Sequence, residues 1–196
     1  MRRILYYLIF VIVIVTVPAC SKKQQYKRLV ERELASGVRN DTLFLNLQLG
    51  MTSEDFYKTC WDLNKAGLIR QGSGNTTVAY EMKEELNFVT NVNFYPSFYE
   101  DKIYEMPVQF KYKAWAPWNK QLQSDRLQLD VLSLFEEWYG KGFFEVAPDA
   151  QKKAFVKVDG NRRISIYKDH VEEGTVWAVF TDLSKEEEVK ALTSKE

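Results

Sequence analysis

Residues 103–113 read IYEMPVQFKYK and contain the most regular alternation of side-chain types in the chain. Apolar residues at every second position are typical of a β-strand with one buried face. Those on the apolar face are Tyr104, Met106, Val108, Phe110 and Tyr112. Pro107 lies on the opposite face and has no N–H to donate to a neighbouring strand. We therefore expect this strand to lie at a sheet edge or to carry a bulge at Pro107.

Further strands are predicted on both sides of this stretch. Residues 76–82, 86–95, 154–158, 162–168 and 175–181 each alternate over a short run. The sequence Asp159-Gly160-Asn161 separates two of these runs and predicts a hairpin turn, because Gly and Asn tolerate positive φ. Residues 42–49 are interpreted as a strand or an extended lead-in, with Leu45, Leu47 and Leu49 on one side.

Two amphipathic helices precede these groups of strands. The first follows the capping sequence Thr52-Ser53-Glu54-Asp55 and ends near Gly67. The second begins at Ser124, where we expect a cap, and runs to about Tyr139, with a stripe of apolar residues along one face. Residues 22–36 are polar and helix-prone and suggest a solvated tether. Residues 184–192 suggest a charged helix or tail.

The order of elements is a helix and three strands, repeated once. It predicts an α+β fold made of two tandem helix-β-β-β units, with an antiparallel sheet and the helices packed on one face. The other face of the sheet would then be partly exposed. The first unit would span residues 41–120, and the second, with a charged tail, residues 121–196.

Composition excludes several classes of protein. The chain has 27 basic and 27 acidic residues in 196 and no basic excess, which argues against a nucleic-acid-binding protein. One histidine, His170, and two cysteines give no spacing for a metal site, and we expect no cofactor. Cys60 is interpreted as a small buried side chain rather than a reactive thiol.

The N-terminal segment has the pattern of a secretion signal. Arg2 and Arg3 are followed by twelve apolar or aromatic residues, Ile4–Val15, which are too few to cross a bilayer as a helix. The sequence Val17-Pro18-Ala19-Cys20 that follows resembles the lipobox of bacterial lipoproteins. Pro18 departs from the usual pattern, while the small residue and the cysteine match it.

This resemblance implies a processed, lipid-anchored protein. Residues 1–19 would be removed, Cys20 would carry diacylglycerol and an acyl chain such as palmitate, and residues 20–40 would form the lipidated N-terminus and helical tether. More than one acyl chain gives stable membrane anchoring. Ser21, where inner-membrane lipoproteins often carry an acidic residue, favours the outer membrane and a domain that faces the periplasm.

A second resemblance concerns the first unit. The run Leu47-Gln48-Leu49-Gly50-Met51-Thr52-Ser53-Glu54-Asp55-Phe56 is similar to the entry into the first helix of outer-membrane assembly lipoproteins of the SmpA/OmlA type. The order of elements also resembles the tandem-repeat fold of β-lactamase-inhibitor proteins. Both resemblances imply a module that binds protein through an exposed sheet face, without catalysis. In neither case can a contact residue of the family be assigned to a position of this sequence.

Aromatic residues near prolines suggest a binding patch. They occur in residues 95–99 and 115–118, and the candidates are Tyr95, Phe98, Tyr99, Trp115 and Trp118. Tyr and Trp are frequent in binding hot spots because they bury a large area with few rotatable bonds. The other interpretation is that these side chains cover the open end of the core.

Catalytic patterns are sparse. Asp169 and His170 are adjacent, but no nucleophile elbow occurs, and the pairs Glu136-Glu137 and Glu172-Glu173 point apart. The leading hypothesis is a non-catalytic envelope lipoprotein that binds a protein partner. The rival hypotheses are a glycan- or small-ligand-binding lipoprotein that uses the aromatic patch, and an enzyme in which Asp169, His170 and a serine converge.

Overall fold

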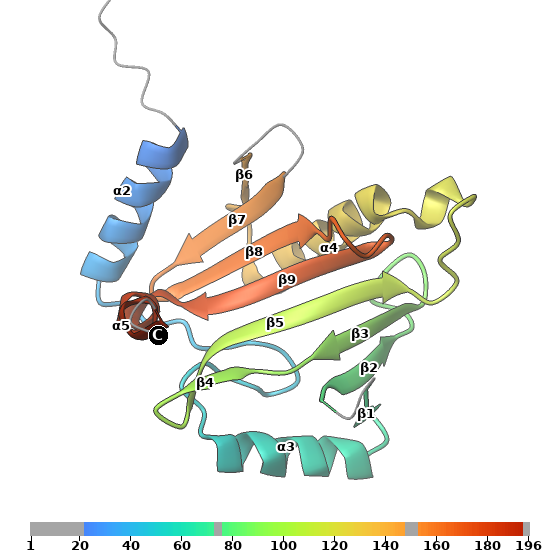
Figure 1. Ribbon diagram of the computed structural model, residues 1–196, viewed down its shortest axis with the longest axis horizontal. Coiled ribbons are helices and arrows are strands. Elements are labelled where there is room, and N and C mark those ends of the chain that lie inside the picture. The colour runs from blue at the N-terminus through green and yellow to red at the C-terminus, as the bar shows by residue number, and fades with distance from the viewer. Residues whose placement is uncertain (1–21, 73–75, 148–152, 194–196) are drawn as a thin grey trace, which may run out of the picture.

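A computed structural model describes residues 22–72, 76–147 and 153–193 of the chain (Figure 1). The helices are α2 (Lys22–Ala35), α3 (Ser53–Lys65), the short 3-10 helix η2 (Lys120–Leu122), α4 (Ser124–Tyr139) and α5 (Leu183–Thr193). The strands are β1 (Ile69–Gln71), β2 (Val78–Met82), β3 (Thr90–Phe94), β4 (Ser97–Tyr99), β5 (Lys102–Tyr112), β6 (Phe144–Val146), β7 (Ala154–Asp159), β8 (Arg162–Lys168) and β9 (Thr175–Asp182).

All nine strands form a single antiparallel sheet, which confirms the predicted α+β class. The order across the sheet is β1-β2-β3-β5-β9-β8-β7-β6, and β4 pairs with β5 beside β3. Each unit is therefore a helix followed by a meander, and the two meanders join through their last strands, β5 and β9. The sequence missed β1, β4 and β6, which have three residues each and are too short to show alternation.

Strand β5 lies in the middle of the sheet, so the expected edge position is wrong. It pairs with β9 along one side and with β3 and β4 along the other. Pro107 is opposite Val179 of β9 and faces, on the other side, the break between β3 and β4. Proline is tolerated here because the ladder is already interrupted, and the register shift lies close by, between Ser97 and Phe98.

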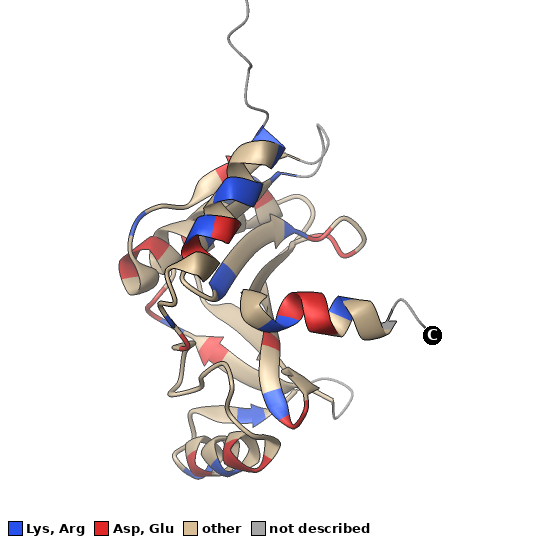
Figure 2. Cartoon of the chain, turned by 90° about the vertical axis from the view of Figure 1, so that its left-hand side faces the viewer, with Lys and Arg blue, Asp and Glu red and all other residues tan. Residues whose placement is uncertain are grey.

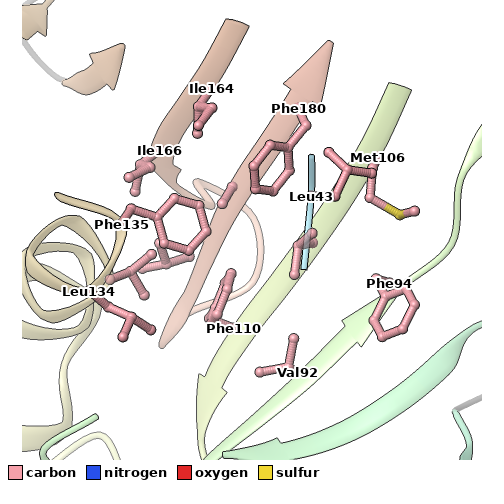
Figure 3. Packing of buried hydrophobic residues seen from close by; sticks show 14 of the residues in the cluster. Leu43, Val92, Phe94, Met106, Phe110, Leu134, Phe135, Ile164, Ile166 and Phe180 are labelled. Atoms are coloured by element: carbon pink, nitrogen blue, oxygen red, sulfur yellow. The ribbon is translucent and has the colours of Figure 1, made fainter. Parts of the chain in front are cut away.

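One face of the sheet, here called the inner face, carries the main core. Side chains from β3, β5, β8 and β9 point to this face, where α4 covers them; Phe56 of α3 joins the same cluster. Figure 3 shows Phe110, Phe135 and Phe180 turned toward one another between α4 and the sheet. The helices of both units therefore lie on one face, as the element order predicts.

Helix α2 packs on the opposite face, here called the outer face. Tyr26, Leu29 and Val30 contact a second small cluster that contains Val156 and Val158 of β7. These two valines alternate with Phe155 and Lys157, and Phe155 packs against the inner core. The helix predicted as a solvated tether thus covers one end of the outer face, although none of its residues is fully buried.

Residues 42–49 form a turn instead of a strand. A single bridge joins Thr42 to Gln48, and the chain reverses because Leu45 and Asn46 have φ values of 50° and 62°. Of the three leucines expected on one side, Leu47 and Leu49 are buried and Leu45 is half-buried, while Leu43 is also buried. A strand and a compact turn can both place alternate leucines on one side, so the spacing of the leucines did not distinguish the two structures.

Of the predicted helix caps and hairpin turn, the cap of α3 and the turn at Gly160 are confirmed, and the cap of α4 is displaced by one residue. Thr52 caps α3 by accepting a hydrogen bond from the Asp55 N–H. Ser124 is the first residue of α4 and not its cap, which is Gln123. Gly160 has a φ of 59° in the β7–β8 hairpin, and a side chain there would meet the carbonyl of Val38. The hairpin therefore also anchors the linker that follows α2.

Candidate functional site

The five aromatic residues of the predicted patch lie at two ends of the sheet. Phe98 and Tyr99 pair with the first residues of β5, and Tyr95 lies in the adjoining break between β3 and β4. Trp115 and Trp118 follow the last residue of β5, Tyr112. The eleven residues of β5, a length of roughly 33 Å, separate Tyr99 from the two tryptophans, and Tyr95 lies level with Pro107, about halfway along the strand. The structure therefore brings the five residues together in two groups and not in one patch.

At the first end, the aromatic side chains pack on α3. Tyr95 and Phe98 both meet the ring of Phe56 edge-on, with centroid distances of 5.9 and 6.0 Å. The Tyr95 hydroxyl lies 2.6 Å from the hydroxyl of Tyr57. Tyr99 has the ammonium group of Lys185 over its ring at 6.0 Å. Tyr95 and Phe98 thus serve the packing of α3, which was the other interpretation of the sequence.

At the second end, the two tryptophans differ. Trp115 packs against the backbone of Gly174, where an added Cβ would collide with its ring. Lys111 stands over that ring at 5.2 Å, and the indole N–H is buried without a partner among the described residues. Trp118 is 84% exposed. Of these two tryptophans, Trp118 therefore has the side chain that is more available for a new contact.

The outer face is open over β8, β9, β5 and β3. In Figure 1 no helix lies in front of the central parts of these strands, whereas α4 lies behind β8 and β9. Neighbouring side chains on this face include the directly paired Tyr167 and Trp177, and the paired Val179 and Pro107. All four are half-buried. Such an apolar strip on an uncovered sheet face is a candidate interaction surface.

Polar side chains border this strip on the side of β5 and β3. Gln109 is paired with Trp177 and with Asn93, and Lys111 is paired with Asn91. Gln109 and Lys111 both bond to the carboxylate of Glu172, at 3.0 and 2.7 Å. The outer face therefore changes from apolar at β8 and β9 to polar at β3, as the centre and rim of a binding surface do.

Two carboxyl groups at the ends of this face have shifted pKa values. The indole N–H of Trp177 donates to Asp169 at 2.7 Å and, together with the N–H groups of Val171 and Glu172, lowers the pKa of Asp169. At the opposite end, burial raises the pKa of Glu105, and the nearby charge of Glu186 adds to the rise. Asp169 thus fixes the orientation of the Trp177 ring.

A separate groove of about 370 Å³ lies between α3 and strands β1 and β2. One wall is formed by Tyr57, Cys60 and Trp61 of α3, with Tyr95 beside them. Tyr57 and Trp61 are 52% and 62% exposed, so their rings are open to solvent. Burial raises the pKa of the Cys60 thiol to about 11, which keeps it protonated and weakly nucleophilic at neutral pH.

A larger cavity of about 620 Å³ lies where the two units meet on the inner face. Its charged side chains bond to one another or to the backbone: Arg162 to Asp159 and to the carbonyl of Thr42, and Glu85 to Tyr80 and two backbone N–H groups. Arg162 also lies over the ring of Tyr139 at 4.9 Å. These groups hold the 40–45 segment against the sheet, and the Nε of Arg162 is buried without a partner among the described residues.

Groups with catalytic potential do not come together in the part of the chain that the structure describes. His170 is exposed in the loop after β8, and its neighbour Asp169 is engaged with Trp177 and two backbone N–H groups. Glu136 pairs with Lys141, and Glu172 with Lys111. Among the described residues, no three His, Cys, Asp or Glu side chains form a group that could hold a metal ion.

Sequence reasoning missed the residues that the structure brings to the surface. Tyr57 and Trp61 are four residues apart and share the exposed side of α3, a spacing that was visible in the sequence. Trp177 and Val179 lie between the inward-facing residues of β9. Apolar residues on both faces of one strand indicate a second contact surface, so this signal was also available.

The predicted lipid site, Cys20, and the signal segment 1–19 lie outside the described residues. Among the helices that are described, none has the length and apolar character needed to cross a membrane. Comparison of the chain with protein-family models, curated proteins and solved structures gives no significant match. The resemblances to the bacterial lipoprotein families therefore rest on the quoted residues alone.

Proposed function

We propose that the chain is a lipid-anchored module of the bacterial envelope that binds a protein partner through its outer face and performs no catalysis. The observation that carries this proposal is the uncovered strip of Tyr167, Trp177, Val179 and Pro107. The inner face of the same strands is sealed by α4, so the strip is not needed to build the core. Anchoring is supported by the lipobox at Val17–Cys20.

The expected partner is a folded envelope protein with an apolar patch surrounded by polar groups. The chemistry of the strip indicates this: two aromatic and two aliphatic side chains in the centre, and Gln109, Lys111 and Asn93 at the border. Aromatic side chains at the centre of a surface contribute most of the binding energy, and the border excludes water. A periplasm-facing position at the outer membrane remains part of the proposal.

Matched variants test the docking surface. Val179→Lys places a charge in the strip, while Leu129→Lys places one on the exposed side of α4, where Leu129 is 54% exposed. Cells that express each variant are treated with a membrane-permeable cross-linker, and the lipoprotein is purified with its adducts for mass spectrometry. We expect wild type and Leu129→Lys to yield the same adduct, and Val179→Lys to lose it. Equal yields from both variants would contradict the proposal.

A separate experiment tests the anchor. Cys20→Ser removes the thiol that would carry the lipid, so the protein should move from the detergent phase to the aqueous phase in a detergent phase-separation assay. Intact mass of the wild-type protein from native membranes should show loss of residues 1–19 and a gain from acyl groups. An unmodified Cys20 with the leader attached would disprove the anchor.

The alternative of glycan or small-ligand binding needs a different site from the one the sequence indicated. Tyr99 lies at one end of β5, and Trp115 and Trp118 lie beyond the other, so one ligand cannot contact all three.

For the enzyme hypothesis, the convergence of Asp169, His170 and a serine would be required. Asp169 instead bonds to Trp177 and two backbone N–H groups, an arrangement that favours a structural role.

A further inference from the structure

We propose that the groove between α3 and strands β1 and β2 is a binding site for a neutral saccharide of one or two pyranose rings. In Figure 1, α3 runs along the end of the sheet formed by β1 and β2. The groove is lined by Phe56, Tyr57, Trp61, Tyr95, Gln71 and Arg70, among others. It is separate from the outer-face strip, so this inference goes beyond the proposed function and does not depend on it.

The aromatic wall of the groove has the geometry for stacking. Tyr57 and Trp61 lie one helical turn apart on α3, so their rings follow each other along the groove. Lys65 stands over one face of the Trp61 ring, 5.2 Å from its centroid. Only the other face is therefore available to a ligand. A pyranose presents a flat set of C–H groups that packs against such a ring, while its hydroxyl groups project around the edge.

Both tyrosine rings beside Trp61 are fixed in place. Tyr57 and Tyr95 join their hydroxyl groups at 2.6 Å, and each ring meets Phe56 edge-on, at 5.5 and 5.9 Å. Phe56 itself is fully buried. Aromatic side chains held by a buried ring lose little conformational entropy when a ligand binds, which favours weak, stacking-based recognition.

Polar groups with unused hydrogen-bonding capacity border the groove. The side chains of Arg70 and Gln71 are exposed and make no side-chain hydrogen bond or ion pair among the described residues. Together with the two tyrosine hydroxyls, they supply both donors and acceptors, which sugar hydroxyls require. A purely apolar ligand would leave these groups unpaired, so the mixed lining favours a saccharide over a lipid chain.

The groove also has a suitable size. Its volume of about 370 Å³ is at the low end of the range for small-molecule sites, roughly 300–1,000 Å³. A folded protein domain could not enter, although an extended peptide side chain could. The side chains of Arg70 and Gln71 favour a saccharide over a peptide side chain, because a sugar hydroxyl can both donate and accept a hydrogen bond at one position.

Calorimetry with the purified full-length protein in detergent micelles tests the inference. The probes are cellobiose, maltose, lactose and diacetylchitobiose, with a tryptophan-containing tripeptide as the competing ligand class. We expect at least one disaccharide to bind, and Trp61→Ala to weaken that binding at least about tenfold. Trp118→Ala removes a more exposed tryptophan at the other end of the sheet and should leave the affinity unchanged.

Cys60 provides a second, independent readout, because its half-buried thiol lines the same groove. At one fixed sugar concentration and mildly alkaline pH, a bound sugar should slow the alkylation of Cys60 in wild type more than in Trp61→Ala. Val179→Lys should bind the sugar normally, which separates this inference from the proposed function. Absence of binding by all four disaccharides, equal affinity of Trp61→Ala, or binding of the tripeptide alone would overturn the inference.

Discussion

The two faces of strand β9 differ sharply although their residues alternate along one backbone. Phe180 is fully buried on the inner face, among the rings of Phe44, Phe135 and Tyr139. Its neighbour Val179 is half-buried on the outer face beside Pro107. Successive side chains of a strand point to opposite sides of the sheet. One strand can therefore supply core residues on its inner face and residues of an interaction surface on its outer face.

The first prediction concerns stability and has the largest expected effect. Phe180→Ala removes a side chain that three aromatic rings contact and should lower the free energy of unfolding by about 3–5 kcal/mol. Val179→Ala should lower it by less than about 1 kcal/mol, because solvent already reaches that side chain. Urea unfolding followed by tryptophan fluorescence measures both. Similar losses for the two variants would remove the distinction between the faces.

A second prediction tests the polar end of the inner face. The buried Tyr112 hydroxyl donates to Asp130 at 2.5 Å, so Tyr112→Phe should cost about 1.5–3 kcal/mol, the value of a hydrogen bond to a charged group. Asp130 keeps its ion pair with Arg126. Tyr104→Phe is the control, since its hydroxyl has no hydrogen bond among the described residues, and it should be near neutral. A neutral result for both variants would show that the Asp130 contact adds nothing.

The covered end of the outer face should respond more weakly. Leu29 of α2 packs against Val156 and Val158, so Leu29→Asn should lower the free energy of unfolding by about 1 kcal/mol. Arg28→Asn changes an exposed residue of the same helix and should have no effect. Thermal unfolding of the two variants compares them. If Leu29→Asn were as stable as Arg28→Asn, α2 would be a free tether, as the sequence suggested.

The smallest expected effect is a pH dependence at Glu105 on the outer face. Burial raises its pKa in the folded state, so ionisation destabilises the fold as the pH rises through that raised value. Glu105→Gln stays neutral and should melt slightly above wild type at pH 7, with the difference disappearing toward pH 4. Melting curves at several pH values measure this. A lower melting temperature at pH 7 would mean that attraction to Arg163 outweighs the burial of Glu105.

Much of this fold follows from local sequence patterns. The alternation in residues 103–113 predicted β5, the Thr52 capping sequence predicted the start of α3, and Asp159-Gly160-Asn161 predicted the β7–β8 hairpin. Each signal is short-range, because it depends on residues within one turn or one strand. The position of β5 in the sheet was not predictable from Pro107, since a break in the neighbouring strand is a tertiary feature.

The candidate sites were less predictable for the same reason. The aromatic residues near prolines were grouped by composition, and only the sheet order shows that a long strand separates Tyr99 from Trp115. Trp177 and Trp61 lie on faces that periodicity does reveal, but which face stays open depends on where α2 and α4 dock. That docking joins residues far apart in the chain, such as Arg163 and Tyr26.

The three-residue strands β1 and β6 occupy the two ends of the sheet order. An edge strand offers unpaired N–H and C=O groups to another chain, and a longer edge makes such pairing more stable. Figure 2 shows α5 projecting from the sheet with both acidic and basic residues on its surface. Short edges therefore help copies of the chain to remain separate instead of adding strand to strand into aggregates.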